Sequence, residues 1–433
     1  MTKKTVCVVG LGYIGLPTAA LLAGNGFNVV GVDLNAHAVA TINQGRIHIV
    51  EPDLDAFVRS AVAAGRLKAY VKPKVADIYM ICVPTPFHEG EGIPQPNVDY
   101  VLSATRSIAE FVKPGDLVIL ESTSPVGTTQ LMADVLATAG VDVAKIHVAY
   151  CPERVLPGKI MTELVENDRV VGGLTREATQ AVSNFYRAFV LGGVLETDAK
   201  TAEMCKLTEN SFRDVNIAFA NELSLICAKE GINVWNLIQL ANRHPRVNIL
   251  QPGAGVGGHC IAVDPWFIVA RDPENARLIR TAREVNNHKT IWAIDQIKIA
   301  VADASARTGR KPKVACLGLA FKPDIDDLRE SPAVHIADAL RSQGYDVVAV
   351  EPNIESHDRF TLVTLEDAFK TADVFAVLVK HRGFLLASVK TALGERGALD
   401  FCGVGSKDNY GVRPAALPAP APACLAMTEF EVG

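Results

Sequence analysis

The six residues GLGYIG at positions 10–15 decide the fold of this chain. They follow a short β-branched run, Thr5–Val9, and precede an apolar stretch, Leu16–Gly24, that has the spacing of a helix. In a strand–turn–helix unit, three glycines at this spacing permit a tight turn, a close approach of the backbone to a pyrophosphate, and close helix–strand packing. The free N–H groups at the start of such a helix attract the same phosphates. The stretch therefore predicts a dinucleotide-binding domain.

An acidic residue at the end of the next strand favours NAD as the dinucleotide. This strand is predicted over Asn28–Val32, and Asp33 follows it, twenty-three positions after Gly10. A carboxylate there can accept hydrogen bonds from both ribose hydroxyls and would repel a 2′-phosphate. FAD shares the glycine fingerprint, and a structural glycine turn without a ligand is a further alternative.

Alternating patterns extend this unit into a doubly wound domain. The apolar runs at Ile78–Val83, Leu117–Glu121 and Ile146–Tyr150 are typical of parallel strands that are buried on both faces. Residues 200–229 contain no Gly or Pro, and their helical spacing of apolar residues predicts one long helix that Gly231 ends. Further helices are predicted over Trp235–Asn242 and Ala276–Asp303.

A second, smaller α/β domain is predicted after the connector 307–313. Its expected strands and helix are Lys313–Leu319, Val347–Glu351, Val374–Val379 and Ala333–Gln343. We therefore predict an α/β protein with two doubly wound, Rossmann-like domains joined by a long central helix. The expected domains are residues 1–198, 199–306 (the central helical part) and 307–412, followed by a flexible Ala/Pro-rich tail, 413–433.

Composition argues against several classes of function. The chain has 433 residues, 49% of them apolar and 21% charged, with a net charge of −5, so a broad basic field for nucleic acid is not expected. No uncharged apolar stretch reaches the roughly 18 residues of a membrane span. The N-terminal run resembles a signal peptide, but its glycines and Pro17 interrupt it. We expect a cytoplasmic protein without a membrane partner.

Nine cysteines are scattered without a C-x-x-C pair, so neither a disulfide framework nor a zinc site is expected. Most should be reduced packing thiols, as in the predicted strands around Cys7 and Cys316. Cys260 differs because it lies in the glycine-rich loop GVGGHCIAVDP, residues 255–265, where the backbone can approach a ligand. From these residues alone, Cys260 is either a nucleophile or one more packing thiol.

Polar residues form a stripe on the predicted long helix. Lys206, Asn210 and Arg213 lie four and three residues apart and project from one side, with Glu203 nearby. A solvated helix face would explain the same stripe. Two further loops, at residues 122–127 and 151–154, follow predicted strands, where doubly wound folds place ligands.

Six segments in combination resemble the UDP-glucose/GDP-mannose dehydrogenase family from residue 10 to about Glu351. They are GLGYIGLPTA (10–19), ESTSPVGTT (121–129), AYCPERVLPG (149–158), EMCKLTENSFRDVNIAFANEL (203–223), GVGGHCIAVDP (255–265) and GLAFKPDIDDLRESPA (318–333). The resemblance implies an enzyme that oxidises the C6 alcohol of a nucleotide sugar to a carboxylate with two NAD. It also implies that the second α/β domain binds the UDP-sugar.

The resemblance assigns roles to individual residues. The implied catalytic residues are Cys260 (nucleophile), Lys206 (general acid/base), Asn210 (oxyanion), Asp264 and Thr123 (positioning of lysine and water) and Glu153 (proton transfer). The implied NAD contacts are Gly10, Gly12, Tyr13, Ile14, Gly15, Asp33, Thr85 and Thr123. The implied substrate contacts are Arg154, Val155, Lys206, Asn210, Arg213, His244, Arg246, Gly257, Phe321, Lys322 and Arg329. No metal is implied.

The implied reaction forms a thiohemiacetal and then a thioester on Cys260, and water finally releases the uronate. A thiol suits both steps, because its adduct can give up hydride and the thiolate can then leave. Lys206 as a nearby cation would lower the thiol pKa and stabilise the oxyanion.

Three stretches point to the sugar. INVW (232–235), NRHPRVNILQPG (242–253) and IAVDPWFI (261–268) are most similar to members that act on UDP-N-acetyl-D-mannosamine. The UDP-N-acetylglucosamine enzymes are the near alternative, whereas glucose-type members carry Pro-Lys in place of Ala262-Val263. The implied product would serve a surface polysaccharide. At Cys402 relatives carry a basic residue, so one substrate contact differs.

Two alternatives from other classes stay open at this stage. A single-hydride dehydrogenase of the hydroxyacid type has the same layout without a thiol, and a non-catalytic nucleotide-sugar binder would need no chemistry. We also expect a homodimer in which the long helix pairs with its copy, because that helix is too apolar to face water.

Overall fold

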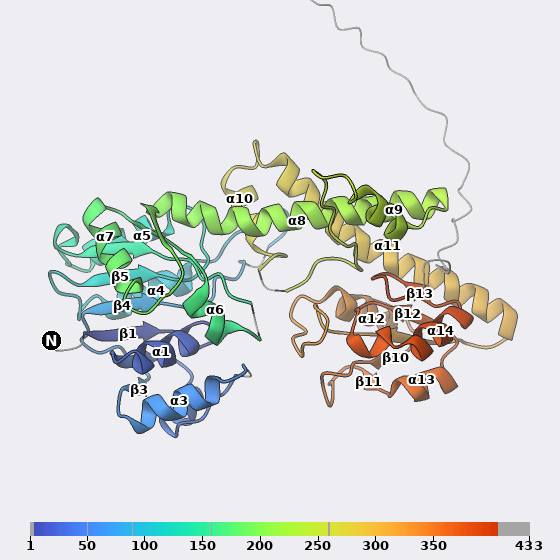
Figure 1. Ribbon diagram of the computed structural model, residues 1–433, viewed down its shortest axis with the longest axis horizontal. Coiled ribbons are helices and arrows are strands. Elements are labelled where there is room, and N and C mark those ends of the chain that lie inside the picture. Colours follow the sequence, from blue (N-terminus) through green and yellow to red (C-terminus); the bar gives the residue numbers. More distant parts are fainter. Residues whose placement is uncertain (1–3, 50, 89, 157, 259, 406–433) are drawn as a thin grey trace, which may run out of the picture. The chain divides into compact units, whose positions relative to one another are not determined.

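The structure is a computed structural model that describes residues 4–49, 51–88, 90–156, 158–258 and 260–405. The chain divides into two compact units. The first unit is Met1–Arg213 with Val263–Thr281, and the second is Asp214–Ala262 with Ala282–Gly433. Both are α/β, as predicted (Figure 1). The predicted tail at 413–433 lies outside the described residues.

The first unit is built on an eight-stranded sheet with the order β3-β2-β1-β4-β5-β6-β7-β8. Its strands are β1 Thr5–Val9, β2 Asn28–Val32, β3 Leu67–Tyr70, β4 Ile78–Ile81, β5 Leu117–Leu120, β6 His147–Tyr150, β7 Arg169–Gly173 and β8 Val194–Asp198. Neighbouring strands are parallel except for β6 and β7, which are antiparallel. The carboxyl ends of β1, β4, β5 and β6 therefore meet at one edge, where this fold binds ligands.

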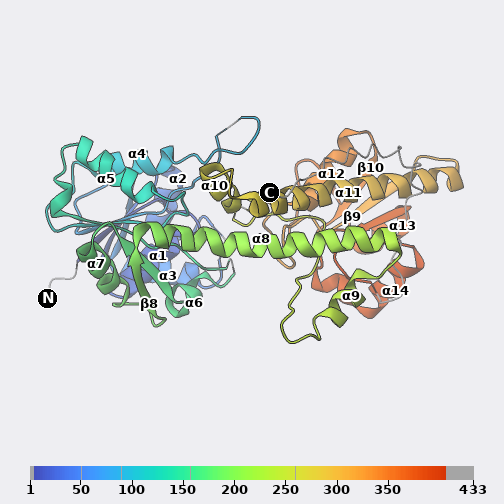
Figure 2. The ribbon, with the colours of Figure 1, turned by 90° about the horizontal axis from the view of Figure 1, so that it is seen from above.

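Helices cover both faces of this sheet. They are α1 Gly15–Gly24, α2 Ala36–Asn43, α3 Leu54–Ala63, α4 Asp99–Ile108, α5 Thr128–Thr138, the 3-10 turn η1 Val143–Lys145, α6 Ile160–Glu166 and α7 Arg176–Tyr186. Helix α10, Asp264–Arg271, also belongs to this unit but contributes no residue to the clusters on the sheet. One buried cluster joins the sheet to α1, α2, α3, α6 and α7, and a second joins its other face to α4 and α5. In Figure 2, α4 and α5 lie on one side of the sheet and α1, α3 and α6 on the other.

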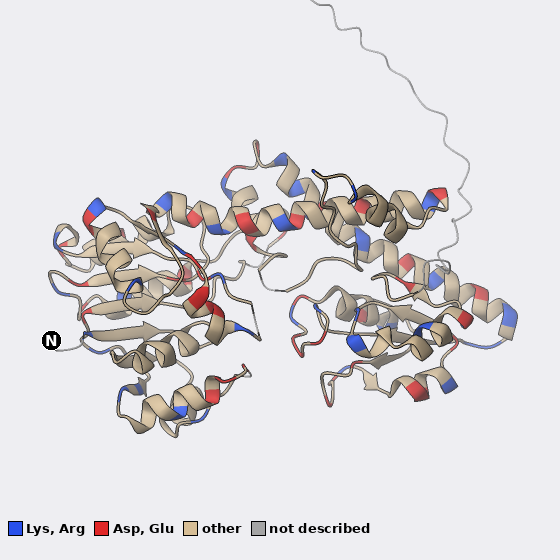
Figure 3. Ribbon diagram, viewed as in Figure 1, with Lys and Arg blue, Asp and Glu red and all other residues tan. Residues whose placement is uncertain are grey.

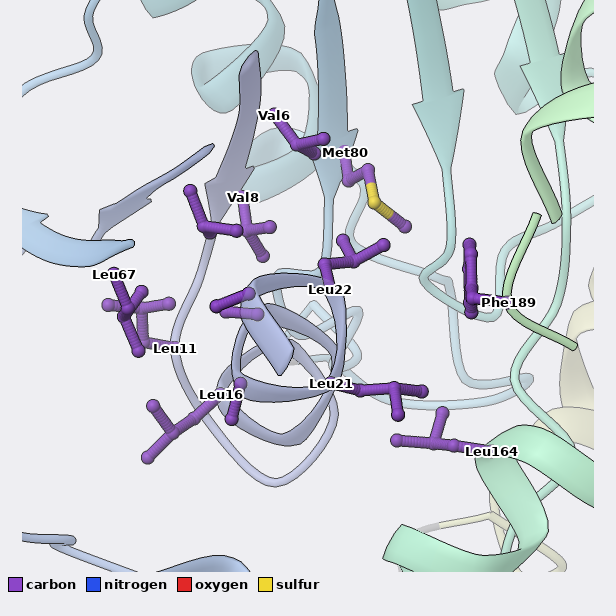
Figure 4. Close-up of a cluster of buried hydrophobic side chains, with 14 of the residues drawn as sticks. Val6, Val8, Leu11, Leu16, Leu21, Leu22, Leu67, Met80, Leu164 and Phe189 are labelled. Carbon is purple, nitrogen blue, oxygen red and sulfur yellow. The ribbon is translucent and has the colours of Figure 1, made fainter. Parts of the chain in front are cut away.

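Strand β1 shows how the sequence sets the two faces. Val6 and Val8 belong to the cluster around α1, whereas Cys7 and Val9 belong to the opposite cluster, because successive side chains of a strand point to opposite faces. Helix α1 is buried along nearly its whole length. Figure 4 shows its leucines packed between β1, β4 and the end of α6. An apolar helix of this kind belongs in a core, which explains why the N-terminal run resembles a signal peptide.

The second unit is built on a five-stranded parallel sheet with the order β11-β10-β9-β12-β13. The strands are β9 Lys313–Leu317, β10 Asp346–Val350, β11 Thr361–Leu362, β12 Val374–Val377 and β13 Leu399–Asp400. The helices are α9 Val234–Ala241, α11 Arg277–Thr308, α12 Pro332–Ser342, α13 Leu365–Thr371, η2 Arg382–Leu385 and α14 Ala387–Glu395. Helices α11 and α12 cover one face, and α13, η2 and α14 cover the other.

The predicted long helix is α8, Ala199–Glu230, and the division between the units falls within it. Gly231 follows it with φ +69°, a conformation that glycine adopts without strain, so this glycine ends the helix as predicted. Acidic and basic residues are interspersed along α8 and α11 (Figure 3). Among the described residues, neither of these helices nor any other is both long and apolar enough to span a bilayer.

Candidate active site

The glycine turn has the geometry of a dinucleotide site. Gly10 has φ +92°, and a Cβ at that position would lie 2.6 Å from the carbonyl oxygen of Cys82. A Cβ at Gly15 would lie 1.8 Å from the carbonyl oxygen of Gly10. A Cβ at Gly12 would meet nothing within 4 Å. The first and third glycines are therefore required by packing, and the second leaves open the space that a pyrophosphate needs.

Asp33 lies beside this turn and retains acceptor capacity. Its Oδ2 accepts the Leu11 N–H at 2.9 Å, and its Oδ1 accepts the Asn35 N–H at 2.8 Å. Each carboxylate oxygen can accept a second hydrogen bond, so the ribose hydroxyls fit here. Tyr13 is exposed in the turn, and Ile14 is the residue before α1. The residues present thus fit NAD.

Two loops at the carboxyl edge of the sheet are tied to each other. The Thr85 hydroxyl donates to the carbonyl oxygen of Thr123 at 2.6 Å, and the Ser122 hydroxyl donates to that of Val83 at 2.6 Å. The structure therefore brings together Thr85 and Thr123, which the sequence placed after β4 and β5.

Lys206, Asn210 and Asp264 form a polar group between α8 and α10. Asn210 Nδ2 donates to Asp264 Oδ2 at 2.5 Å, Lys206 and Asp264 are buried, and Asn210 is half-buried. Burial raises the pKa of Asp264 to about 6, while the charge of Lys206 and the hydrogen bond from Asn210 oppose that rise. Lys206 and Asp264 are thus close enough to interact electrostatically. A solvated face is the wrong interpretation for this part of the stripe.

Glu203, the fourth member of the stripe, has a different role. Its Oε2 accepts the Gly127 N–H at 2.6 Å, and its Oε1 accepts the N–H and hydroxyl of Thr129 at 2.8 and 2.6 Å. The carboxylate, which is fully buried, therefore caps the start of α5. Nothing in the sequence indicated this partner, because the bonds span more than seventy residues.

Glu153 is held in a buried ion pair that the sequence did not predict. Its Oε2 accepts from Arg169 Nη1 at 2.8 Å, and the two side chains are 8% and 1% exposed. Arg154, the neighbouring candidate, pairs with Glu209 of α8 at 2.7 Å. A charged residue in a short strand such as β7 is expected at the surface, so its sequence gave no sign that Arg169 would be buried.

A second carboxyl, Glu121, lies in the same buried region. It accepts from Tyr186 OH at 2.9 Å and from Cys82 Sγ at 3.1 Å. Burial, and then the nearby charge of Glu153, raise the pKa of Glu121 to about 7. With a pKa of about 7, Glu121 is partly protonated at neutral pH.

The cysteine loop up to Ala262 belongs to the second unit, where its glycines pack against the β9–α12 loop. The Gly258 N–H donates to the carbonyl oxygen of Arg329 at 3.2 Å. A Cβ at Gly257 would lie 2.4 Å from the carbonyl oxygen of Glu330, and one at Gly258 would lie 2.8 Å from the Phe321 ring. The glycines are thus required by close packing, and Cys260 follows them, half-buried.

The other predicted substrate contacts occupy several positions. Lys322 Nζ lies 5.9 Å from the centre of the Phe321 ring, and Arg329 pairs with Asp327 at 2.6 Å. The exposed candidates are Arg213, His244 and Arg246, and Val155 is half-buried. The structure brings Gly257, Phe321 and Arg329 together within the second unit.

The second unit repeats the strand-end acid of the first. Glu351, at the end of β10, accepts the N–H groups of Leu319 and Asn353 at 2.7 and 3.0 Å, as Asp33 accepts those of Leu11 and Asn35. It also accepts the Ala320 N–H and lies 3.0 Å from Nε2 of the buried His381. These partners fill its acceptor positions, so Glu351 orders the loops that follow β9 and β10.

Most of the other cysteines behave as predicted. The buried thiols are Cys7, Cys151, Cys227, Cys316 and Cys402, whereas Cys82 and Cys205 are half-buried, and Cys424 lies outside the described residues. Cys402 supplies no cation, because a thiol is either neutral or anionic, and burial raises its pKa and so favours the neutral form. No group of metal ligands occurs among the described residues.

The comparisons with known proteins match three successive parts of the chain. Three models of the UDP-glucose/GDP-mannose dehydrogenase family match: the NAD binding domain at residues 4–190, the central domain at 200–288 and the UDP binding domain at 315–404.

Individual relatives cover nearly the whole chain. UDP-N-acetyl-D-mannosamine dehydrogenase of Escherichia coli (strain K12) is 58% identical over 402 residues, which are 89% of this chain and 95% of that protein. NDP-N-acetyl-D-galactosaminuronic acid dehydrogenase of Ralstonia nicotianae is 55% identical over 395 residues, 88% of this chain and 92% of that protein. The solved structure of the UDP-D-ManNAc dehydrogenase from Pyrococcus horikoshii is 37% identical with a TM-score of 0.83, over 94% of this chain and 97% of that one.

Proposed function

Because the chain belongs to the UDP-glucose/GDP-mannose dehydrogenase family, we propose that it oxidises UDP-N-acetyl-D-mannosamine at C6 to UDP-N-acetyl-D-mannosaminuronate. The observation that best supports the reaction type is the group of Lys206, Asn210 and Asp264, which belongs to the same unit as a glycine turn that fits NAD. The 58% identity to the Escherichia coli mannosamine enzyme supports the choice of sugar.

NAD, when bound at the glycine turn, accepts hydride from C6 of the substrate. Two such transfers convert an alcohol to an acid, so the overall change is alcohol plus water plus two NAD⁺ to carboxylate, two NADH and three protons. The chain must then supply a base for the C6 hydroxyl, a nucleophile that binds the aldehyde covalently, and a group that activates water.

In the proposal, Lys206 handles the proton of the C6 hydroxyl, and Asn210 donates to the developing oxyanion. Asp264 holds both residues: its carboxylate accepts from Asn210 and faces the charge of Lys206. With a pKa of about 6, Asp264 is mostly ionised at neutral pH, so a negative charge faces Lys206 and Asn210 during the reaction.

Cys260 supplies the covalent step. Its thiolate adds to the C6 aldehyde, and the resulting thiohemiacetal keeps the carbon bound while the second hydride leaves. The product of that transfer is a thioester, from which water displaces the thiolate and releases the uronate. Glu153, with Thr123, is proposed to take the proton from that water. The ion pair with Arg169 fixes the position of the Glu153 carboxylate for this role.

The UDP part is proposed to bind the second unit through Phe321, Lys322 and Arg329, on the loop that contacts the cysteine segment. The other proposed substrate contacts are Arg154, Val155, Arg213, His244, Arg246 and Gly257. We further propose a cytoplasmic reaction whose product is a donor for a surface polysaccharide.

A panel of UDP-N-acetylhexosamines tests the substrate. The manno, gluco and galacto epimers are supplied with NAD, and kcat/KM is obtained from NADH absorbance at 340 nm. We expect the manno epimer to have the highest kcat/KM. The galacto epimer belongs in the panel because of the 55% identical Ralstonia relative, and a higher kcat/KM for it or for the gluco epimer would overturn the choice of sugar.

The same assay separates the other mechanism classes. A single-hydride dehydrogenase would yield one NADH per sugar and would tolerate iodoacetamide. A non-catalytic binder would bind UDP-sugars without forming NADH. Inactivation by iodoacetamide, with the label mapped to Cys260, is the outcome that supports the proposal.

A homodimer through α8 completes the proposal. Phe212, Phe219 and Ile226 are spaced by seven residues and are 70%, 54% and 51% exposed, so they form one apolar stripe on the helix. Phe219→Glu is expected to yield a monomer in sedimentation equilibrium at micromolar concentration, where the wild type is a dimer. A wild-type monomer would contradict this assembly.

A further inference from the structure

The segment that precedes Cys260 has little means of fixing its own position. Residues 253–258 include four glycines, and Gly255 and Gly258 have φ values of +147° and +81°. Glycine has no side chain to pack and the largest backbone freedom, so such a segment is ordered by bonds from its neighbours. Within the second unit those neighbours are α8, α11 and the β9–α12 loop.

Three hydrogen bonds hold the segment. Asn221 Oδ1 of α8 accepts the Gly253 N–H at 2.9 Å. The Thr290 hydroxyl of α11 donates to the carbonyl oxygen of Ala254 at 3.0 Å. At the other end, the Gly258 N–H reaches the carbonyl oxygen of Arg329, as described above. Asn221 therefore fixes the residue where the glycine-rich segment begins.

Asn221 is itself fixed by a directional chain of buried groups. Its Nδ2 donates to Asn286 Oδ1 at 2.8 Å, and Asn286 Nδ2 donates to Asp214 Oδ1 at 2.8 Å. Arg283 Nη1 donates to the same Asp214 oxygen at 2.7 Å. A carboxylate only accepts, so Asn286 must turn its NH₂ toward Asp214 and its oxygen toward Asn221. Asn221 must in turn present its oxygen to Gly253.

Burial makes this chain rigid. Asp214 and Asn221 are fully buried, Asn286 is 1% exposed and Arg283 is 3% exposed. If one of these amides were flipped, its NH₂ would face another donor or its oxygen another acceptor. No water reaches these groups, so the unmade hydrogen bonds would cost free energy. The orientation set at Asp214 is therefore transmitted to the Gly253 N–H.

We propose that Asn221 is a positioning residue for Cys260, which it places through the Gly253 hydrogen bond, with Asn286 and Asp214 setting its orientation. The inference rests on the proposed function only in taking Cys260 as the nucleophile. Because the loop glycines also contact Phe321 and the Arg329 backbone, Asn221 keeps the thiol in register with the loop proposed to bind UDP.

The test measures two quantities separately: the reactivity of the Cys260 thiol in the free protein, and the rate of turnover. Full-length wild type, Asn221→Ala and Asn286→Ala are alkylated with iodoacetamide, and the rate constant at each cysteine is followed by peptide mass spectrometry. Asn43→Ala is the matched control: Asn43 also bonds one backbone N–H and one carbonyl, both of Ala69, but in the first unit. Steady-state kcat and KM are measured with the best UDP-sugar and NAD.

We expect alkylation of Cys260 to accelerate about threefold or more in Asn221→Ala and Asn286→Ala, while kcat falls about tenfold, since small misplacements of a reacting group are costly. The KM for NAD should stay unchanged, because the dinucleotide turn lies in the other unit. The buried Cys227 and Cys316 should stay unreactive, which distinguishes a loosened loop from an unfolded unit. Asn43→Ala should match the wild type in the Cys260 rate constant and in kcat.

A folded Asn221→Ala whose Cys260 rate constant is unchanged or lower, or whose kcat equals that of the wild type, would overturn the inference. If Asn221→Ala does not fold, Asn286→Ala decides in the same way, because it retains Asn221 and removes the side chain that orients it. The alkylation rate needs no substrate. A protein that forms no NADH with any UDP-sugar therefore refutes the proposed function, while the effect of Asn221 on the thiol can still be read.

Discussion

The two outer glycines of the dinucleotide turn differ from the middle one in what an added methyl group would meet. Gly15→Ala places its Cβ against the Gly10 carbonyl oxygen and should lower the free energy of unfolding by about 1–3 kcal/mol, as other overpacked sites do. Gly12→Ala faces open space and should leave stability nearly unchanged, but it should raise the KM for NAD about tenfold. Urea unfolding and initial rates measure the two effects. Equal effects of both variants on stability would contradict the geometry.

Asp264 should impose an acid limb on the pH–rate profile. Burial raises its pKa to about 6, so lowering the pH through 6 protonates it and removes the charge that faces Lys206. We expect log kcat/KM to fall with unit slope below about pH 6. Asp264→Asn should be slow at every pH and should lack this limb. A limb that persists unchanged in Asp264→Asn would assign it to another group.

The same pKa has a consequence for stability, with the opposite sign. The folded pKa is raised above the ordinary value of 3.8, so the folded protein binds the proton more tightly than the unfolded chain does. The contribution of Asp264 to the free energy of unfolding therefore decreases as the pH rises from about 4 to 6 and is constant above that range. Comparing the Tm of wild type and Asp264→Asn at these two pH values isolates this contribution.

At the scale of elements, the start of α5 depends on a residue of α8. Glu203 accepts three hydrogen bonds there, from Gly127 and Thr129. A glutamine side chain has only one acceptor oxygen, and its NH₂ group would face one of these N–H donors. Glu203→Gln should thus lower the free energy of unfolding by about 1–3 kcal/mol. Glu222→Gln, an exposed change on the same helix, is the control. Equal midpoints of urea unfolding for both variants would show that the cap contributes nothing.

The sequence predicted some elements with nearly their observed bounds and missed others. Strands β1 and β2 were predicted with their observed bounds, and α8 within one residue at each end. Strand β7 was missed because it begins with Arg169 and ends in two glycines, a composition that is unusual for a buried strand. Helix α10 was missed because its eight residues follow a glycine-rich loop and have too few turns to show a period.

At the scale of the whole molecule, the family and the α/β class were predictable, but the supports of the site were not. The glycine turn and Asp33 lie close together in the sequence, so their pattern could be recognised. Arg169 with Glu153, Glu209 with Arg154, and Asn221 with Gly253 are pairs far apart in the chain. The spacing of residues in the sequence does not predict such pairs, because they depend on which strands and helices become neighbours in the fold. The predicted domain borders and the dimer stay predictions.

The number of NADH molecules formed per UDP-N-acetyl-D-mannosamine distinguishes oxidation to the acid from a single hydride transfer. With limiting sugar and excess NAD, we expect two NADH per sugar for the wild type and loss of turnover for Cys260→Ser, with UDP-N-acetyl-D-mannosaminuronate as the product identified by mass spectrometry. One NADH per sugar in the wild type, or a Cys260→Ser protein with unchanged turnover, would contradict this expectation.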